Sequence, residues 1–176
     1  MTPDASSPPT TVPKPGRYLT FKLGPESYGL PVLGVREIIR LCPITPVRRM
    51  PAYIKGVINL RGKVIPILDL RAKFQLSTGS YGDRACIVVV QVGAPPATVM
   101  LMGAIVDAVE EVVQLGEAEL EPTPDFGGTP RTDYILGMAT IHGGVKTLLD
   151  LDKVFLKEGV LTLIPAPTPN PQNQTV

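Results

Sequence analysis

The chain has 176 residues, enough for one domain of ordinary size or two very small lobes. Its 17 Lys and Arg nearly balance 16 Asp and Glu, so a net charge of +1 gives no strong field for non-specific nucleic-acid binding. Apolar residues make up 44% of the chain, which excludes a wholly disordered protein. Two Cys residues, Cys42 and Cys86, are too few for a disulfide framework and are predicted to be reduced and mostly buried.

The two ends of the chain are rich in proline. Five of the 20 prolines lie in residues 1–16 and four lie in residues 165–171, among Ser, Thr, Asn and Gln. Such segments bury too little apolar surface to offset the entropy of ordering. We therefore predict a disordered arm over residues 1–16 and a C-terminal extension with a Pro-rich tail over residues 159–176.

No segment has the pattern of a signal peptide or a membrane span. The longest uninterrupted apolar stretch, Val99–Val106, has 8 residues, whereas a membrane-spanning helix needs roughly 20. The N-terminus carries Asp4 and prolines where a signal peptide would carry basic residues and an apolar run. We expect a cytoplasmic protein whose folded unit runs from about residue 17 to residue 164.

Short runs of β-branched and apolar residues, bounded by Gly, Pro or Asp, dominate the folded part and predict strands. In chain order these runs are residues 18–23, 57–60, 64–68, 85–92 and 98–102. Tight turns that contain Gly62 and Gly143 predict hairpins. Asp69 and Asp150 are each placed to cap a short helix, the second of which is the longer. Many short strands joined by close turns favour small antiparallel barrels over a layered α/β fold.

The chain also contains an internal repeat. Residues 53–74 align without a gap with residues 134–155, at an offset of 81, and nine of the 22 positions are identical. A weaker match, at an offset of 74, relates residues 28–39 to residues 102–113. Chance similarity between two apolar hairpins is the alternative, but the shared Gly and Asp positions serve turns and caps rather than bulk hydrophobicity.

The repeat predicts an all-β fold of two similar small five-stranded SH3-like β-barrels that share one apolar seam. Short helical turns and a short C-terminal helix complete the fold. The first lobe is expected mainly in residues 17–80 and the second mainly in residues 81–158. The sequence leaves open whether strands interweave between the lobes. Each half is near the size at which a barrel is marginal alone, so the lobes should support one another.

The side chains offer little for catalysis. The single histidine, His142, falls on a predicted hairpin turn, and no phosphate-binding glycine loop is present. The acidic residues between Glu110 and Glu121 lack a second acidic set at metal-binding spacing. We predict no enzyme activity, no metal and no cofactor, and we assign the remaining apolar surface to protein–protein recognition.

Nucleic-acid binding by a small barrel is an alternative. Four arginines form a local basic cluster: Arg36, Arg40, Arg48 and Arg49. Recognition of this kind normally interleaves stacking aromatic residues with basic ones, and here only Tyr53 lies near the cluster. The sequence therefore favours a protein partner over nucleic acid.

One stretch resembles a known family. Gly56–Arg71, with the sequence GVINLRGKVIPILDLR, is similar to the signature of CheW-type chemotaxis coupling proteins. Further similar segments, within a resemblance that spans about residues 17–158, are YGLPV at 28–32, VREI at 35–38, ITPV at 44–47 and VDAVEEV at 106–112.

The resemblance implies a non-catalytic adaptor. It would join the cytoplasmic tips of chemoreceptors, the methyl-accepting chemotaxis proteins, to the regulatory domain of the histidine kinase CheA. Its location would be the receptor array near the inner membrane, reached only through the receptors. The same role in a twitching or developmental pathway is an alternative.

The resemblance also implies functional residues. Six positions match the surface that binds receptor or kinase: Val35, Glu37, Ile38, Arg61, Gly62 and Gly103. Glu37 and Arg61 are expected to form an ion pair that holds the hairpin tip against a strand edge. For Asp69, Asp150 and Gly143, the repeat indicates structural roles as caps and a turn.

Overall fold

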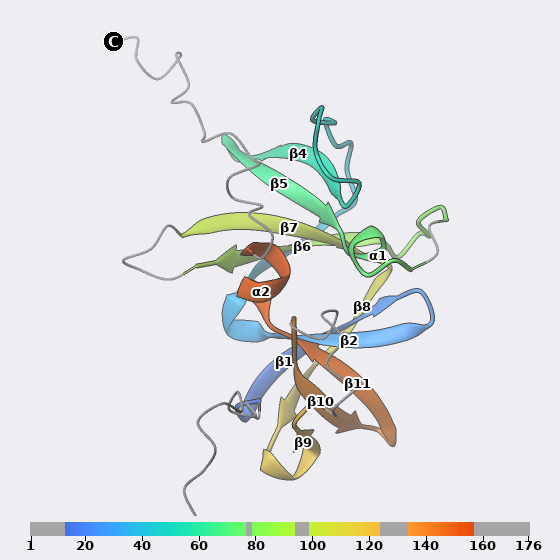
Figure 1. Ribbon diagram of the computed structural model, residues 1–176, viewed down its shortest axis with the longest axis vertical. Helices are drawn as coiled ribbons and strands as arrows, with labels where there is room; N and C mark the ends of the chain where they lie inside the picture. Colours follow the sequence, from blue (N-terminus) through green and yellow to red (C-terminus); the bar gives the residue numbers. More distant parts are fainter. Residues whose placement is uncertain (1–12, 77–78, 94–98, 124–133, 157–176) are drawn as a thin grey trace, which may run out of the picture.

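Two β-sheets stacked on one another form the molecule, and two short helices lie between them (Figure 1). The computed structural model describes residues 13–76, 79–93, 99–123 and 134–156. The prediction of an all-β protein with few and short helices is confirmed.

The six-stranded sheet has the order β8 (Ala108–Leu115), β1 (Gly16–Leu23), β2 (Glu26–Pro31), β11 (Gly144–Leu149), β10 (Ile135–Ile141) and β9 (Leu120–Glu121). The five-stranded sheet has the order β3 (Val35–Arg40), β6 (Cys86–Val92), β7 (Met100–Val106), β5 (Lys63–Asp69) and β4 (Ile54–Leu60). The helical segments are η1 (Val32–Gly34), α1 (Leu70–Lys73), η2 (Glu117–Glu119) and α2 (Leu151–Leu156). We call residues 13–31 and 107–156 the terminal lobe and residues 32–106 the central lobe.

The sheets do not follow the lobe ranges 17–80 and 81–158 that the repeat suggested. Strands β1 and β2 join the sheet of β8 to β11, whereas β6 and β7 join the sheet of β3 to β5. The exchange is made by two parallel pairings, β2 with β11 and β7 with β5. The first two strands of each repeat therefore complete the sheet of the other repeat. The side-chain pattern of a strand does not state which of two similar edges it joins, so the sequence left this exchange open.

The two lobes share their irregularities as well as their strand order. Strands β4 and β10 each carry a shift in register just before an identical glycine, Gly56 in one and Gly137 in the other. A Cβ atom at Gly56 would run into the carbonyl oxygen of Thr45, and one at Gly137 would lie 2.7 Å from the carbonyl oxygen of Glu121. Glycine is required at both places because the neighbouring backbone crosses the strand there.

The N-terminal segment is ordered earlier than predicted. Pro13 is buried, and its ring occupies the space that a side chain at Gly137 would need. The predicted disordered arm, 1–16, therefore ends in residues that pack on the terminal lobe. Residues 1–12 of that arm, and the C-terminal residues 157–176, lie outside the described residues.

The largest core cluster lies between the lobes rather than inside either one. It combines side chains of the terminal lobe, such as Phe21, with side chains of the central lobe, such as Val90 and Met102, all fully buried. Its aromatic members continue across the seam, because the Phe74 ring lies 5.6 Å from Tyr28 and 4.7 Å from Tyr134 between ring centroids. Each lobe has a smaller cluster of its own. The lobes thus depend on one another for burial of apolar surface.

Candidate functional site

The turn between β4 and β5 contacts the opposite edge of its own sheet. Arg61 and Gly62 have φ angles of 51° and 86°, as a two-residue hairpin turn requires. The two terminal nitrogens of Arg61 donate to the two carboxylate oxygens of Glu37, and both distances are 2.8 Å. Glu37 lies on the edge strand β3, so this bidentate pair connects the two edges of the central sheet. The pair has the partners and the geometry that the resemblance implied.

The terminal lobe makes the same contact with different residues. His142, in the β10–β11 turn, has its Nε2 atom 2.9 Å from Oε1 of Glu111 on β8. His142 is 81 positions after Arg61, and Glu111 is 74 positions after Glu37, so both partners occupy repeat-matched positions. We call each pair a hairpin–edge contact. The sequence pattern predicted an ordinary turn residue at His142, although the two repeat offsets, applied to Glu37 and Arg61, lead directly to Glu111 and His142.

Exposed apolar side chains recur at matching positions beside both contacts. In the central lobe, Ile38 is 46% exposed and Val64 is 60% exposed. In the terminal lobe, Val112 is 54% exposed and Val145 is 71% exposed. The same offsets of 74 and 81 relate the two pairs. We use the name central patch for the two exposed positions Ile38 and Val64, and the name terminal patch for their repeat-matched counterparts Val112 and Val145. Of these four residues, only Ile38 was predicted as a site residue.

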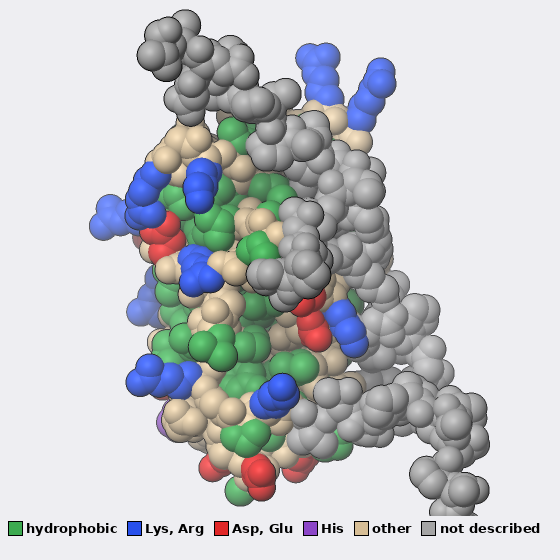
Figure 2. All heavy atoms as spheres, turned by 90° about the vertical axis from the view of Figure 1, so that its left-hand side faces the viewer, with side chains coloured by type: hydrophobic (Ala, Val, Ile, Leu, Met, Phe, Trp, Pro, Cys, Tyr) green, Lys and Arg blue, Asp and Glu red, His purple; other side chains and the backbone are tan. Residues whose placement is uncertain are grey.

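The two lobes carry opposite charges. The central lobe holds ten Lys and Arg against three Asp and Glu, whereas the described residues of the terminal lobe hold five against nine. The difference reaches the patches, because Arg36 and Arg40 flank Ile38 on β3 while Glu110 and Gln114 hold the matching positions around Val112. In Figure 2 most basic side chains lie over the upper half of the face shown, and acidic ones gather at its lower end.

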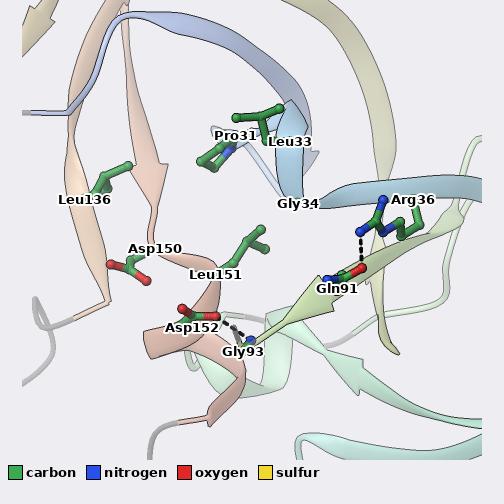
Figure 3. A pocket seen from close by; sticks show the side chains of 10 residues that line it. All are labelled: Pro31, Leu33, Gly34, Arg36, Gln91, Gly93, Leu136, Asp150, Leu151 and Asp152. Atoms are coloured by element: carbon green, nitrogen blue, oxygen red, sulfur yellow. Dashed lines mark hydrogen bonds between the residues drawn. The ribbon is translucent and has the colours of Figure 1, made fainter. Parts of the chain in front are cut away.

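A cavity of about 350 Å³ opens between the lobes (Figure 3). Its walls come from β2 and η1, the end of β6, β10 and the start of α2: Pro31, Leu33, Gly34, Arg36, Gln91, Gly93, Leu136, Asp150, Leu151 and Asp152. Leu33, at the rim, is 94% exposed.

Not every predicted site residue faces a partner. Val35 begins β3 and packs partly buried against the main core, and the amide of Gly62 donates to the Asn59 side chain at 2.8 Å. Gly103 is buried in β7, where an added Cβ atom would lie 2.6 Å from Ile67 and 2.8 Å from Ile87. Gly103 therefore faces the core of the central lobe, and its role as a direct contact residue stays a prediction.

The predicted caps lie where the repeat put them. The Asp69 carboxylate accepts from the amide of Arg71 at 3.0 Å, and the Asp150 carboxylate accepts from the amide of Lys153 at 3.2 Å. Gly143 has a φ of 79° in the second hairpin turn. These three residues have structural surroundings and serve the start of each helix and one turn.

Within the described ranges, no group of three or more His, Cys, Asp and Glu could hold a metal ion. None of the helices in this part of the chain is long and apolar enough to cross a membrane. Burial raises the pKa of the Cys86 thiol, which keeps it in its less reactive protonated form.

The fold and these surfaces define a class of protein: duplicated β-barrels that expose apolar residues at matching places, as scaffolds that bind other polypeptides do. The chain belongs to the CheW family, because the model of the CheW-like domain matches residues 17–158. It is 35% identical over 141 residues to a chemotaxis protein CheW of Klebsiella aerogenes, covering 80% of this chain and 82% of that one. It is also 35% identical over 144 residues to a chemotaxis protein CheW of Rhizobium meliloti, covering 81% and 90%.

A solved structure agrees with the sequence relatives. The crystal structure of the scaffolding protein TtCheW from Thermoanaerobacter tengcongensis superposes with a TM-score of 0.73 at 32% identity. The superposition covers 82% of this chain and 95% of that chain. The family resemblance found in the sequence is therefore confirmed.

Proposed function

We propose that this chain is an adaptor that couples chemoreceptors to the histidine kinase CheA in a chemotaxis signalling array. The observation that carries the proposal is the pair of matching patches, one on each lobe, each beside a hairpin–edge contact. A chain with two similar exposed surfaces can hold two other polypeptides at once. Coupling requires this property, whereas a protein with one binding site would only sequester its partner.

Opposite charge on the two lobes gives each patch a different preference. The central patch lies among arginines and favours an acidic partner surface, while the terminal patch lies beside Glu110 and Glu111 and favours a basic one. Partners with the wrong charge are rejected, because like charges would be brought together at the contact. We propose that one patch binds the regulatory domain of the kinase and that the other patch binds a second protein of the array.

The edge of the central lobe near the interlobe cavity supports the receptor contact. Val35 begins β3 beside the cavity residues Gly34 and Arg36, and Ile38 is exposed farther along the same strand. The helical tip of a receptor presents apolar side chains at positions i, i+3 and i+4, which such an edge and cavity can accept. The adaptor would therefore lie at the cytoplasmic side of the membrane, through its receptors, and act by binding rather than by chemistry.

Co-sedimentation of the purified chain with a receptor signalling fragment and with CheA tests the coupling. Replacing Arg61 with Glu breaks the bidentate contact and places a second carboxylate beside that of Glu37. We expect at least about a tenfold loss of affinity for one partner, with an unchanged β-sheet circular-dichroism signal. Arg84→Glu is the matched control, because it makes the same charge change at an exposed position before β6.

A second pair of variants separates the two patches. Ile38→Glu should weaken binding of one partner, and Val112→Glu, its repeat-matched counterpart, should weaken binding of the other. Adaptor function would be contradicted if the wild-type chain bound neither partner, or if both patch variants bound both partners as well as wild type.

The positive charge of the central lobe makes nucleic acid an alternative ligand to protein partners. Tyr53, the aromatic residue nearest the arginine cluster, has Lys73 Nζ 4.4 Å from its ring centroid and packs on the main core. One face of this ring is therefore occupied by a cation, and a base cannot stack there. Treating the captured complex with nuclease should leave receptor and kinase bound.

A further inference from the structure

The duplication relates two grooves between the lobes. Each groove is formed by three parts. These are a helix, the glycine that follows strand β1 or β6, and the residue that links β2 to β3 or β7 to β8. In one groove these parts are α2, Gly93 and Leu33, and this is the cavity of Figure 3. In the other they are α1, Gly24 and Asp107. We call the first the open groove and the second the closed groove.

The closed groove is filled by side chains of the chain itself. Arg71 on α1 forms an ion pair with Asp107, in which Nε donates at 3.1 Å, and its Nη1 donates to the carbonyl of Gly79 at 3.0 Å. The guanidinium lies 4.3 Å from the ring centroid of Tyr81. Asp107 also accepts from the amide of Gly24 at 2.5 Å. The side chains of Arg71 and Asp107 are only 11% and 17% exposed.

A second cation of the closed groove lies beside the residue that caps α1. Lys55 Nζ lies 3.9 Å from the carboxylate of Asp69, the capping residue of α1. The closed groove therefore contains two carboxylates, from Asp69 and Asp107, and two cations, from Lys55 and Arg71. An aromatic ring completes its packing.

The open groove has lost both cations, keeps one of the two carboxylates and carries a new carboxylate where one cation would be. Asp150 matches Asp69, but Asp152 stands at the position of Arg71 and Leu136 at the position of Lys55. Asp152 accepts from the amide of Gly93 at 2.9 Å, and Leu33 occupies the position of Asp107. Among the described residues, no Lys or Arg nitrogen lies within 4.0 Å of either carboxylate.

Both carboxylates retain capacity to bind. Among the described residues, Asp152 and Asp150 each accept one hydrogen bond from a backbone amide, whereas an ionised carboxylate can accept about four. The cation in the wall, Arg36, donates instead to the side chain of Gln91 on the other side of the cavity. The groove thus combines an acidic end at α2 with apolar side chains from Leu33, Leu136 and Leu151.

We propose that the open groove binds a partner segment that carries a Lys or Arg next to a large apolar side chain. The cation sits between Asp150 and Asp152, as Arg71 and Lys55 sit against the carboxylates of the closed groove. The apolar side chain covers Leu33 and packs on Leu136. A cavity of about 350 Å³ has room for such side chains but not for a whole helix, so the rest of the segment stays outside. The inference rests on the proposed adaptor function for the protein nature of its partner.

Two synthetic helical peptides test this pairing. They share one amphipathic sequence with a Leu three positions from a variable residue, which is Lys in the first peptide and Glu in the second. Fluorescence anisotropy measures the binding of each labelled peptide to the full chain at low salt. We expect the Lys peptide to bind at least about tenfold more tightly than the Glu peptide, since the groove selects by charge.

Variants of the groove locate the effect. Asp152→Asn keeps the hydrogen bond to Gly93 but removes the charge, and it should abolish most of the discrimination. Leu136→Lys restores the cation of the closed groove and should weaken the Lys peptide about tenfold, which provides a second test if Asp152→Asn is poorly folded. Asp83→Asn is the matched control, because Asp83 is exposed and outside the cavity lining.

Equal binding of the two peptides, no binding of either, or full discrimination in both groove variants would overturn the proposal. Failure of the adaptor function is distinguishable. If the chain bound neither receptor fragment nor CheA but still discriminated between the peptides through Asp152, the groove would keep its specificity while the named partners would be wrong.

Discussion

The central and terminal lobes have one architecture and opposite surfaces. Strand order, the register shift before Gly56 and Gly137, and the helix caps Asp69 and Asp150 agree between them. Net charge, the residue in the hairpin turn and the contents of the interlobe groove all differ. The comparison teaches that duplication has preserved what the backbone needs, because a turn or a crossing strand tolerates few alternatives, while exposed side chains were free to diverge.

Substitution in the closed groove should lower the unfolding free energy far more than the matched substitution in the open groove. Replacing Arg71 with Met leaves Asp107 without its charged partner in a mostly buried site, so we expect a loss of about 3 kcal/mol in unfolding free energy. The repeat-matched change Asp152→Met, at an exposed position, should cost less than about 1 kcal/mol. Urea unfolding of both variants measures the difference. Equal losses would mean that the two grooves are energetically alike.

Glycines at matching places should cost similar amounts in the two lobes. Gly103→Ala adds a methyl group against Ile67 and Ile87, and Gly29→Ala adds one 2.7 Å from Leu148. Each should lower the unfolding free energy by about 1–3 kcal/mol, because the core must shift to accept the extra volume. Chemical denaturation measures both, and co-sedimentation of folded Gly103→Ala should equal wild type. Normal stability with impaired binding would restore Gly103 as a contact residue.

The closed groove should make the unfolding free energy depend on alkaline pH, whereas the open groove should not. Burial raises the pKa of Tyr81 in the closed groove above its ordinary value of 10.0, and burial likewise raises the pKa of Tyr28 in the seam. Above about pH 10 the unfolded chain releases these protons and the folded chain keeps them, so unfolding free energy falls as pH rises. The slope approaches about 1.4 kcal/mol per pH unit for each such tyrosine.

Tyr81→Phe and Tyr28→Phe should each flatten this slope between pH 10 and pH 11.5, measured by urea unfolding at fixed pH. The open groove has no tyrosine in its lining, so Leu136→Lys should leave the slope unchanged. A wild-type stability that is flat over this pH range would contradict the burial of both phenols.

Exchanging the hairpin–edge residues should give the smallest effect. In the double variant Arg61→His with His142→Arg, each turn keeps a nitrogen donor facing its glutamate, and both turn positions stay exposed. We expect the thermal unfolding midpoint to move by less than about 2 °C, as is usual for exposed ion pairs. A large shift in either single variant would show that the two contacts are not equivalent. Differential scanning calorimetry makes the comparison.

The site could be predicted in part. Glu37 and Arg61 lie in a distinctive motif, and the two residues meet as the resemblance implied. Val112 and Val145 were missed because a valine in a strand looks the same whether it faces the core or solvent. The contact role of Gly103 stays a prediction, because a glycine in a strand can mark close packing as easily as a contact surface.

The order of residues along the chain was sufficient for several features held by local chemistry: the strands near residues 18–23, 57–60, 64–68 and 85–92, the Gly62 and Gly143 turns, the Asp69 and Asp150 caps, and the duplication itself. Tertiary structure alone decided which copy of each strand pair completed which sheet, since two similar edges offer the same hydrogen bonds. It also sorted opposite charges onto the two lobes and left one groove open. Those outcomes depend on residues far apart in the chain, such as Arg71 and Asp107, which only the folded backbone brings together.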